Sequence, residues 1–525
     1  MNEKKNNIKE KLKENKRKII VIAILILGCL IRILNIADIP NAINCDEASS
    51  GYEAYSILNY GIDRNGNHIP AFLVAWGGGQ NALLSYIMIP FIKILGLTTL
   101  SIRLPMAILG CISLIIFYLL LKKIANQKLA LIGVAFFAIC PWHIMKSRWG
   151  LESNLFPDLI LIFVYLLIKG IEDKNKILYY ISFVIAGLTA YAYGTSYYFL
   201  PAFLIPLLYV LVKKRKITIK EAVISILIVG IISLPIILYV IINTLNLPQI
   251  NLPFVTVPKL EVNRYKELTS IFSSQFFKET FENFYLGMVI LIIQTDWLPW
   301  NNVVPFGTMY VFSIIFTVIG IAENFKKNKK IEIKYSYLFN IWFIVCIILT
   351  LICEPNINRL NIMMIPIAYY TVLGIYIFIK KFEKDKHQKK IIIAIITIYI
   401  ISFMAFAIKY VNEDCDSYGT FAGDLEEVMQ YVEQKEDKQI YFTNDMNYIY
   451  VLFYTKYDVR DYIETVQYED EHVEFRKVNS FGNYVFTDFE ELADGNIYVI
   501  NKKDKEKYNL ENHKITEFKR YLVVE

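Results

Sequence analysis

The sequence predicts a polytopic α-helical membrane protein that ends in a small α/β domain outside the membrane. The 525 residues are 55% hydrophobic with a mean hydropathy of +0.40, which is too apolar for an ordinary water-soluble protein. Apolar runs of spanning length recur up to residue 410, whereas residues 412–525 carry 13 Lys/Arg against 26 Asp/Glu. The basic residues before that point cluster in short loops between apolar runs, as cytoplasmic loops do, so they indicate topology and no nucleic-acid partner.

The N-terminus sets the predicted orientation of the chain. Residues 1–18 contain eight Lys/Arg, and the apolar stretch 19–36 follows without a small-residue cleavage site at its end. This pattern predicts a cytoplasmic basic N-terminus and an uncleaved first span. Asp46 and Glu47 would then emerge on the outer side of the membrane.

The membrane region is predicted to cover residues 19–410, with a first outer loop at 37–102 and a long outer loop at 244–307. The apolar stretch 81–97 contains Pro90 and Lys93 and suits either a span or a helix on the outer surface. A surface helix keeps the later basic clusters inside, and we adopt it. The remaining spans are predicted at 103–121, 128–144, 155–170, 177–192, 197–213, 221–243, 308–323, 335–352, 360–381 and 390–410. About eleven spans place the C-terminus outside.

Residues 411–525 are predicted to form the extracytoplasmic α/β domain. The pattern at 424–434 fits an amphipathic helix, and β-rich runs lie at 439–443, 484–486 and 496–500. The aromatic run 448–454 suits a helix or a strand. The seven cysteines form no CxxC pair, so neither a disulfide framework nor a zinc site is predicted.

Asp46 and Glu47 are the first candidates for chemistry. A carboxylate at the boundary between water and membrane could take the proton of an attacking hydroxyl, and ionised groups there are costly and usually functional. The alternative is structural: Asp46 could cap a helix over 47–60, with Glu47 favourable in its first turn.

Two arginines, Arg103 and Arg359, each open a span from the outer side. A single arginine at a span end usually extends its charged head to the interface. The planar guanidinium can instead hold a phosphate through several N–H donors. The two positions lie on the same predicted side as Asp46, so we interpret them as binding an anionic headgroup.

The outer segment 141–152 gathers further polar groups, among them His143, Arg148 and Glu152. If this segment were one helix, Arg148 and Glu152 would share a face and could form a plain salt bridge. The functional alternative is donor-phosphate binding or a carboxylate ligand to a divalent ion, although too few oxygen ligands are visible to assign a metal. Trp297 suits an interfacial anchor or a wall of the substrate cleft.

These motifs resemble a known family. Asn44-Cys-Asp46-Glu47 with Tyr52-Glu-Ala54, and Gly96-Leu-Thr-Thr-Leu-Ser-Ile-Arg103-Leu-Pro105, look like bacterial protein O-mannosyltransferases of glycosyltransferase family 39. The segments Ser147-Arg148 with Glu152 and Asn358-Arg359-Leu360 are also similar. The resemblance covers about residues 19–410 and implies a GT-C fold related to lipid A aminoarabinose transferases. The chain departs from those transferases at Gly78-Gly79-Gln80-Asn81, where they carry a Lys-Pro pair, which argues against a lipid A acceptor.

The resemblance implies an inverting transfer of mannose or another sugar from a polyprenyl-phosphate donor at the outer face of the bacterial cytoplasmic membrane. By position, Asp46 would be the base with Glu47 beside it, and Arg103, Arg148 and Arg359 would bind the donor phosphate. His143, Glu152 and Trp297 would belong to the cleft. The acceptor, whether a protein, a glycolipid or a cell-wall polymer, stays open, as does a divalent cation. The alternative function is a transporter or flippase of lipid-linked sugars, although no inverted repeat supports it.

Overall fold

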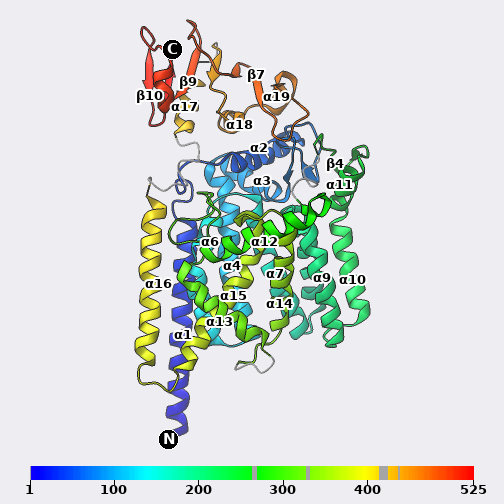
Figure 1. Cartoon of the computed structure of the whole chain (residues 1–525), viewed down its shortest axis with the longest axis vertical. Helices are drawn as coiled ribbons and strands as arrows, with labels where there is room; N and C mark the ends of the chain where they lie inside the picture. The colour runs from blue at the N-terminus through cyan, green and yellow to red at the C-terminus, as the bar shows by residue number, and fades with distance from the viewer. Residues whose placement is uncertain (1, 263–268, 327–330, 413–423, 436–437) are drawn as a thin grey trace.

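The fold has three tiers, which Figure 1 shows from bottom to top. The computed structural model describes residues 2–262, 269–326, 331–412, 424–435 and 438–525. A bundle of long, roughly parallel helices forms the lowest tier, helices between residues 45 and 95 lie across its upper end, and a mixed sheet with short helices stands above them. The predicted polytopic helical fold with a C-terminal sheet is confirmed in this form.

Among the described residues, five helices are long and apolar enough to cross a membrane, or six if one bent pair counts as a span. The five are α4 (Thr99–Ile124), α7 (Glu152–Glu172), α9 (Ser196–Lys213), α15 (Ile357–Lys381) and α16 (Gln388–Val411). Shorter apolar helices accompany them: α5 (Gln127–Ala138), α8 (Lys176–Leu188), α13 (Ile314–Phe325) and α14 (Ser336–Ile352). The apolar end of α1 (Asn2–Ile33) carries the predicted first span. The count of eleven spans therefore stays a prediction.

Two of the predicted spans are interrupted at prolines. The stretch 221–243 is two helices, α10 (Ile219–Ile232) and α11 (Leu234–Leu245), bent by 62° at Ser233, with Pro235 in the first turn of the second. The stretch 128–144 ends as α5 at Ala138, and the short helix α6 (Pro141–Lys146) begins at Pro141. A proline lacks the backbone N–H that would bond to the preceding turn, so a break is favoured at these two sites. Each of the two predicted stretches is therefore a pair of helices, and whether each pair crosses the membrane as one span stays a prediction.

The middle tier consists of α2 (Cys45–Tyr60) and α3 (Leu83–Leu95), which cross the end of the bundle rather than run with it. This is the orientation predicted for 81–97. The cap of α2 is Asn44, whose side chain accepts from the backbone N–H of Asp46 while the Glu47 carboxylate accepts from the N–H of Asn44. Asp46 lies in the first turn, so the alternative in which Asp46 caps this helix is wrong.

The upper tier is a seven-stranded sheet in the order β10-β11-β9-β5-β8-β7-β6, in which β5 runs parallel to β8 and β9. Its strands are β5 (Ile440–Phe442), β6 (Gln467–Tyr468), β7 (Val478–Phe481), β8 (Tyr484–Phe486), β9 (Ile497–Asn501), β10 (Ile515–Glu517) and β11 (Tyr521–Val524). The helices α17 (Leu425–Val432), α18 (Tyr448–Thr455) and α19 (Val459–Thr465) accompany it. The predicted helix and three strands are present within two residues, and 448–454 is helical. The predicted start of the domain at 411 adjoins 413–423, which lie outside the described residues.

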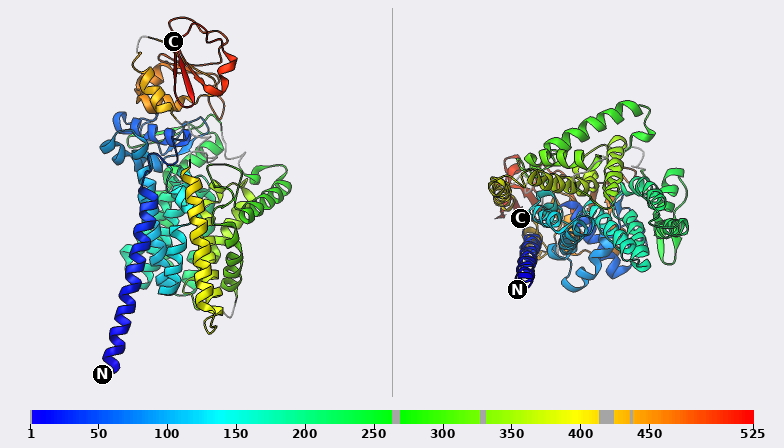
Figure 2. Two further views of the ribbon diagram at one scale, coloured as in Figure 1. Left: turned by 90° about the vertical axis from the view of Figure 1, so that its left-hand side faces the viewer. Right: turned by 90° about the horizontal axis from the view of Figure 1, so that it is seen from below.

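The upper tier rests directly on the first outer loop. The hydroxyl of Tyr52 on α2 donates to the carbonyl of Tyr457 at 2.8 Å. The backbone N–H of Gly78 donates to Glu474 O at 2.8 Å, and that of Arg476 donates to Trp76 O at 2.9 Å. Figure 2 shows the sheet above the helices from a second direction, while α1 extends below the bundle. The sheet and the outer loop therefore share main-chain hydrogen bonds.

Candidate active site

A cavity of about 130 Å³ lies at the end of the bundle that faces the sheet, and we call it the inner cavity. It is lined by Phe72, Gly78, Gly79, Asn81, Glu152, Tyr193, Gly194, Thr195, Tyr198, Thr269, Cys353 and Arg359. These residues come from the first outer loop, the start of α7, the turn before α9, and the start of α15. Two of the residues selected from the sequence, Glu152 and Arg359, line it together.

Arg359 brings a positive charge to the inner cavity from the first turn of α15. Its backbone N–H is capped by the side chain of Asn356 at 2.8 Å. Within the described residues its side-chain hydrogen bonds both use Nη1, which donates to the carbonyl of Glu354 at 2.7 Å and to its carboxylate at 3.0 Å. Nε and Nη2 of the guanidinium thus remain as donors for an anion in the cavity.

Glu152 brings a carboxylate to the opposite wall. It is the first residue of α7, where an acidic side chain favours the helix, and it accepts a short hydrogen bond from the backbone N–H of Asn81. The Asn81 side chain in turn donates to the hydroxyl of Tyr197 at 2.9 Å. The salt bridge considered between Arg148 and Glu152 requires one helix, but α6 ends at Lys146 and α7 starts at Glu152, so that alternative is wrong.

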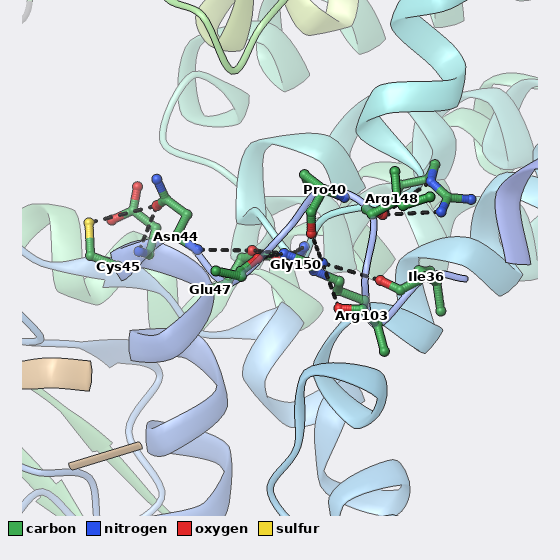
Figure 3. Close-up of polar contacts among 12 residues, drawn as sticks. Ile36, Pro40, Asn44, Cys45, Glu47, Arg103, Arg148 and Gly150 are labelled. Carbon is green, nitrogen blue, oxygen red and sulfur yellow. Dashed lines mark hydrogen bonds and ion pairs between the residues drawn. The ribbon is translucent and has the colours of Figure 1, made fainter. Parts of the chain in front are cut away.

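Glu47 and Arg103 form a fully buried ion pair beside this wall (Figure 3). Arg103 donates from Nε and Nη2 to the two oxygens of Glu47, each at 2.9 Å. Its Nη1 also donates to the carbonyls of Pro40 at 2.7 Å and Ile36 at 3.2 Å. Glu47 accepts the backbone N–H of Gly150 at 2.7 Å, two residues before Glu152. The pair fixes the loop before α2 and the entry to α7, and phosphate binding by Arg103 stays a prediction.

Arg148 and His143 lie away from the inner cavity. Arg148 is buried and donates to the carbonyls of Ile31 at 2.6 Å and Leu34 at 2.9 Å, so its charge faces the C-terminal end of α1. His143 is buried and accepts at Nδ1 from Nε of Arg32 at 3.1 Å. Their predicted contacts with the donor therefore stay predictions, while the structure gives both residues internal partners.

Trp297 is exposed over 64% of its surface, as an interfacial anchor would be. Its neighbour Asp296 is the more connected residue. The Asp296 carboxylate accepts from the backbone N–H of Ile357, the first residue of α15, at 2.8 Å and from the Asn301 side chain at 2.7 Å. Burial raises the pKa of Asp296. This residue, which the sequence analysis did not select, fixes the start of the helix that carries Arg359.

Asp46 lines a second cavity of about 270 Å³ between α2 and the sheet, which we call the outer cleft. Its lining residues are Cys45, Asp46, Trp76, Asn444, Asp445, Met446, Asn447, Tyr448, Phe475, Arg476, Lys477, Val478 and Phe486. The sequence analysis placed Asp46 and Arg359 in one site. In the structure Asp46 lines the outer cleft, whereas Arg359 lines the inner cavity. The segment 76–81 contributes to both: Trp76 lines the outer cleft, while Gly78, Gly79 and Asn81 line the inner cavity.

Several lining residues escaped the sequence analysis. Tyr193 and Thr195 belong to the short run that separates two predicted spans, and Tyr198 lies at the start of the second; the position of this run at the predicted outer end was a usable signal. No group of three or more His, Cys, Asp or Glu side chains that could hold a metal occurs among the described residues. We therefore derive no step through a metal, and the divalent cation stays a prediction.

Comparisons with known proteins agree with this geometry. Residues 81–242 match the family model described as dolichyl-phosphate-mannose-protein mannosyltransferase. ArnT from Cupriavidus metallidurans, solved with bound undecaprenyl phosphate, has a similar structure, with 11% identity, a TM-score of 0.57, and coverage of 96% of this chain and 97% of ArnT. An oligosaccharyltransferase from Archaeoglobus fulgidus, in the apo form, has 11% identity and a TM-score of 0.52 over 83% of this chain and 63% of its own length. No curated protein sequence matched the chain.

The structural matches confirm the predicted GT-C membrane fold, which this chain shares with ArnT. The family match, carried by 81–242, identifies a glycosyltransferase. That segment contains Asn81, Arg103, Glu152 and Tyr193, so it includes parts of both the inner cavity and the buried Glu47–Arg103 pair.

Proposed function

We propose that this chain is an inverting glycosyltransferase that moves a sugar from a polyprenyl-phosphate donor to an acceptor hydroxyl on the outer side of the cytoplasmic membrane. The observation that carries the proposal is the placement of Arg359 in the inner cavity. A guanidinium with unused N–H donors beside a helix N-terminus suits a phosphate, because the N-terminal end of a helix is positive and Arg binds phosphate oxygens through its planar fork. The sugar is mannose or another hexose.

The reaction breaks the bond between the anomeric carbon and the phosphate oxygen. The acceptor oxygen attacks the anomeric carbon, its proton passes to the carboxylate of Asp46, and the electron pair of the broken bond stays on the polyprenyl phosphate. Arg359 stabilises the charge that gathers on that phosphate as it leaves. Asp46 suits the role of base because it is half-buried in the first turn of α2 and lines a cleft open to the outer side.

Glu47 contributes by position rather than by proton transfer. Both of its oxygens are held, by Arg103 and by the backbone N–H groups of Asn44 and Gly150. The Glu47–Arg103 pair therefore fixes both Asp46, which follows Asn44 and Cys45, and Glu152, which follows Gly150. Glu152 supports the wall of the inner cavity through Asn81 and faces the sugar.

The decisive experiment replaces the two cavity carboxylates in turn. In a purified assay with a polyprenyl-phosphate-linked mannose, Asp46→Asn is expected to lower kcat by about 10²–10⁴-fold, the usual contribution of a general base. The exposed Asp494→Asn serves as a matched control in the upper tier. A larger loss in Glu152→Gln than in Asp46→Asn would assign the base to Glu152. A wild-type protein that moves the intact lipid-linked sugar without breaking its phosphate bond would be a transporter, which would overturn the proposal.

A further inference from the structure

We propose that the outer cleft binds the acceptor and that the acceptor is a carbohydrate, with the C-terminal sheet domain supplying half of its binding site. This inference rests on the proposed function, because it names the substrate that meets Asp46. It is carried by three features of the outer cleft: its aromatic rings, its polar lining, and its relation to the inner cavity.

One of the two aromatic rings, that of Trp76, is held in place before any ligand binds. Trp76 lies between two partners, since the guanidinium carbon of Arg64 is 4.6 Å from its ring centroid and the ring of Tyr448 meets it edge-on at 5.9 Å and 78°. Phe475, which lies on the sheet side, is 59% exposed although it is a large apolar residue. The C–H faces of sugar rings pack on aromatic faces, whose π-electron density is negative, and a ring that is already fixed loses little entropy on binding.

The polar lining suits hydroxyl groups. Asn444, Asn447 and Asp445 offer amide and carboxylate groups, and Arg476 and Lys477 offer donors from the neighbouring strand region. The Asn447 amide is fixed because its oxygen accepts from the N–H of Ile449 at 3.1 Å. A lipid chain in this cleft would leave such groups without partners, which is costly, whereas sugar hydroxyls both donate and accept. Its cavity volume of about 270 Å³ is near the lower end of the range for small-molecule sites, which suits a small sugar ligand.

The cleft also adjoins the inner cavity, because the segment 76–81 contributes residues to both. The Gln80 side chain donates to Ser50 Oγ at 2.9 Å and to the carbonyl of Asp46 at 3.4 Å, so it ties the shared segment 76–81 to the first turn of α2. Gly77, Gly78 and Gly79 carry no side chains, and a Cβ on Gly78 would come within 2.6 Å of Glu474 Cγ. The segment 76–81 therefore packs closely on the sheet domain and lies between the two cavities, with Asp46 in the outer cleft.

The test measures acceptor and donor separately. Purified full-length enzyme is given polyprenyl-phosphate-linked radiolabelled mannose and increasing amounts of the polysaccharide fraction of an envelope from a strain lacking this protein. Phe475→Ala, which removes an exposed ring, is expected to raise the KM for the polysaccharide about tenfold and to leave the KM for the donor within twofold. Trp76→Ala is expected to do the same more strongly. Phe254→Ala removes a 70% exposed ring on another loop and is the matched control.

Each outcome decides between stated alternatives. Equal changes in both KM values, or no change in either, would overturn the acceptor assignment. Label that enters protease-sensitive protein and not polysaccharide would overturn the carbohydrate class and favour a protein acceptor. Arg359→Gln is expected to raise the donor KM instead, so it separates the two cavities. A wild-type enzyme that never cleaves the donor would overturn the proposed function itself, a result distinct from the loss of acceptor binding alone.

Discussion

The regions around Arg103 and Arg359 look alike in the sequence and differ in the structure. Each arginine lies in the first turns of a long apolar helix, α4 or α15, at the same end of the bundle. Arg103 is fully buried and uses Nε, Nη1 and Nη2 on Glu47 and on backbone carbonyls. Arg359 lines the inner cavity and makes its side-chain hydrogen bonds to Glu354 through Nη1. The role of an arginine at a span end therefore depends on how many of its N–H groups already donate hydrogen bonds to the chain itself.

The largest expected effect is on the stability of the Arg103 region. Arg103→Ala leaves the buried carboxylate of Glu47 without its charge partner, and breaking a buried pair in this way costs about 3–5 kcal/mol. We expect a severe loss of folded protein, measured as the yield of monodisperse enzyme and its thermal unfolding in detergent. The double variant Glu47→Gln/Arg103→Met should recover part of the loss, because no buried charge is then left unpaired. If the Arg103→Ala variant is stable but does not bind the donor, the result would support the sequence-based prediction that Arg103 binds the donor phosphate.

The Arg359 region should lose function without losing stability. Arg359→Gln removes charge-assisted hydrogen bonds to the donor phosphate, each worth about 1.5–3 kcal/mol, so kcat/KM should fall about 10–100-fold. The midpoint of thermal unfolding should stay close to that of the wild type, since among the described residues the side chain pairs with the largely exposed Glu354. Arg359→Lys should retain part of the activity as a point charge. Unfolding of Arg359→Gln at a much lower temperature would make this region structural as well.

A third arginine, Arg64, lies beside a buried carboxyl group whose protonation should make the stability of the fold depend on pH. Arg64 is buried beside Glu53, with 3.2 Å between Nε and Oε1. Burial, with a contribution from Asp63, raises the pKa of Glu53 from 4.5 to about 7, although Arg64 opposes the shift. Because the folded pKa is raised, the stability that this group contributes is fully present below about pH 4.5 and is lost as the pH rises through about 7.

We therefore expect the midpoint of thermal unfolding to fall between about pH 5 and pH 8, by about 2–4 °C for each kcal/mol lost. Glu53→Gln should flatten this dependence, while the exposed Glu490→Gln should leave it unchanged. A steep pH dependence that persists in Glu53→Gln would assign the titration to another group.

The smallest effect is expected at Trp297. Its ring is 64% exposed, and surface substitutions away from special features change stability by about 0.5 kcal/mol or less. Trp297→Ala should keep both activity and unfolding temperature in detergent. A tenfold loss of activity would return Trp297 to the cleft wall proposed from the sequence.

Much of the fold could be predicted because hydropathy and charge act locally. Apolar runs located the bundle helices, and β-rich runs located three strands of the sheet to within two residues. The sequence analysis did not place the helix breaks at Pro141 and at Ser233, which precedes Pro235. The residues on both sides of each proline are apolar, so hydropathy alone predicted one continuous stretch.

The site was less predictable because its contacts join residues far apart in the chain. Arg103 and Glu47 are 56 residues apart, and Gly150 is 103 residues from Glu47. No local pattern reveals which carboxylate a buried guanidinium will meet. The assignment of Asp46 to the outer cleft likewise depends on Trp76 and on Asn444 to Phe486, and a sequence motif near residue 46 contains no information about them.

The position of α16 has a consequence for the modularity of the enzyme. Only 11% of its span is buried, and it stands at the edge of the bundle, with Tyr399, Phe406 and Tyr410 as its buried residues. The helix α16 contacts the bundle through these few buried residues, and the sheet domain that follows it contacts the first outer loop. We therefore expect α16 and the sheet domain to behave as one unit that can be separated from the rest of the chain. Two polypeptides, divided in the exposed turn at 383–387, should reassemble when they are co-expressed, as co-purification through a tag on the second would show. If the two polypeptides do not associate, the unit depends on its covalent connection to the bundle. If they do associate, the part proposed to recognise the acceptor can be exchanged as a module.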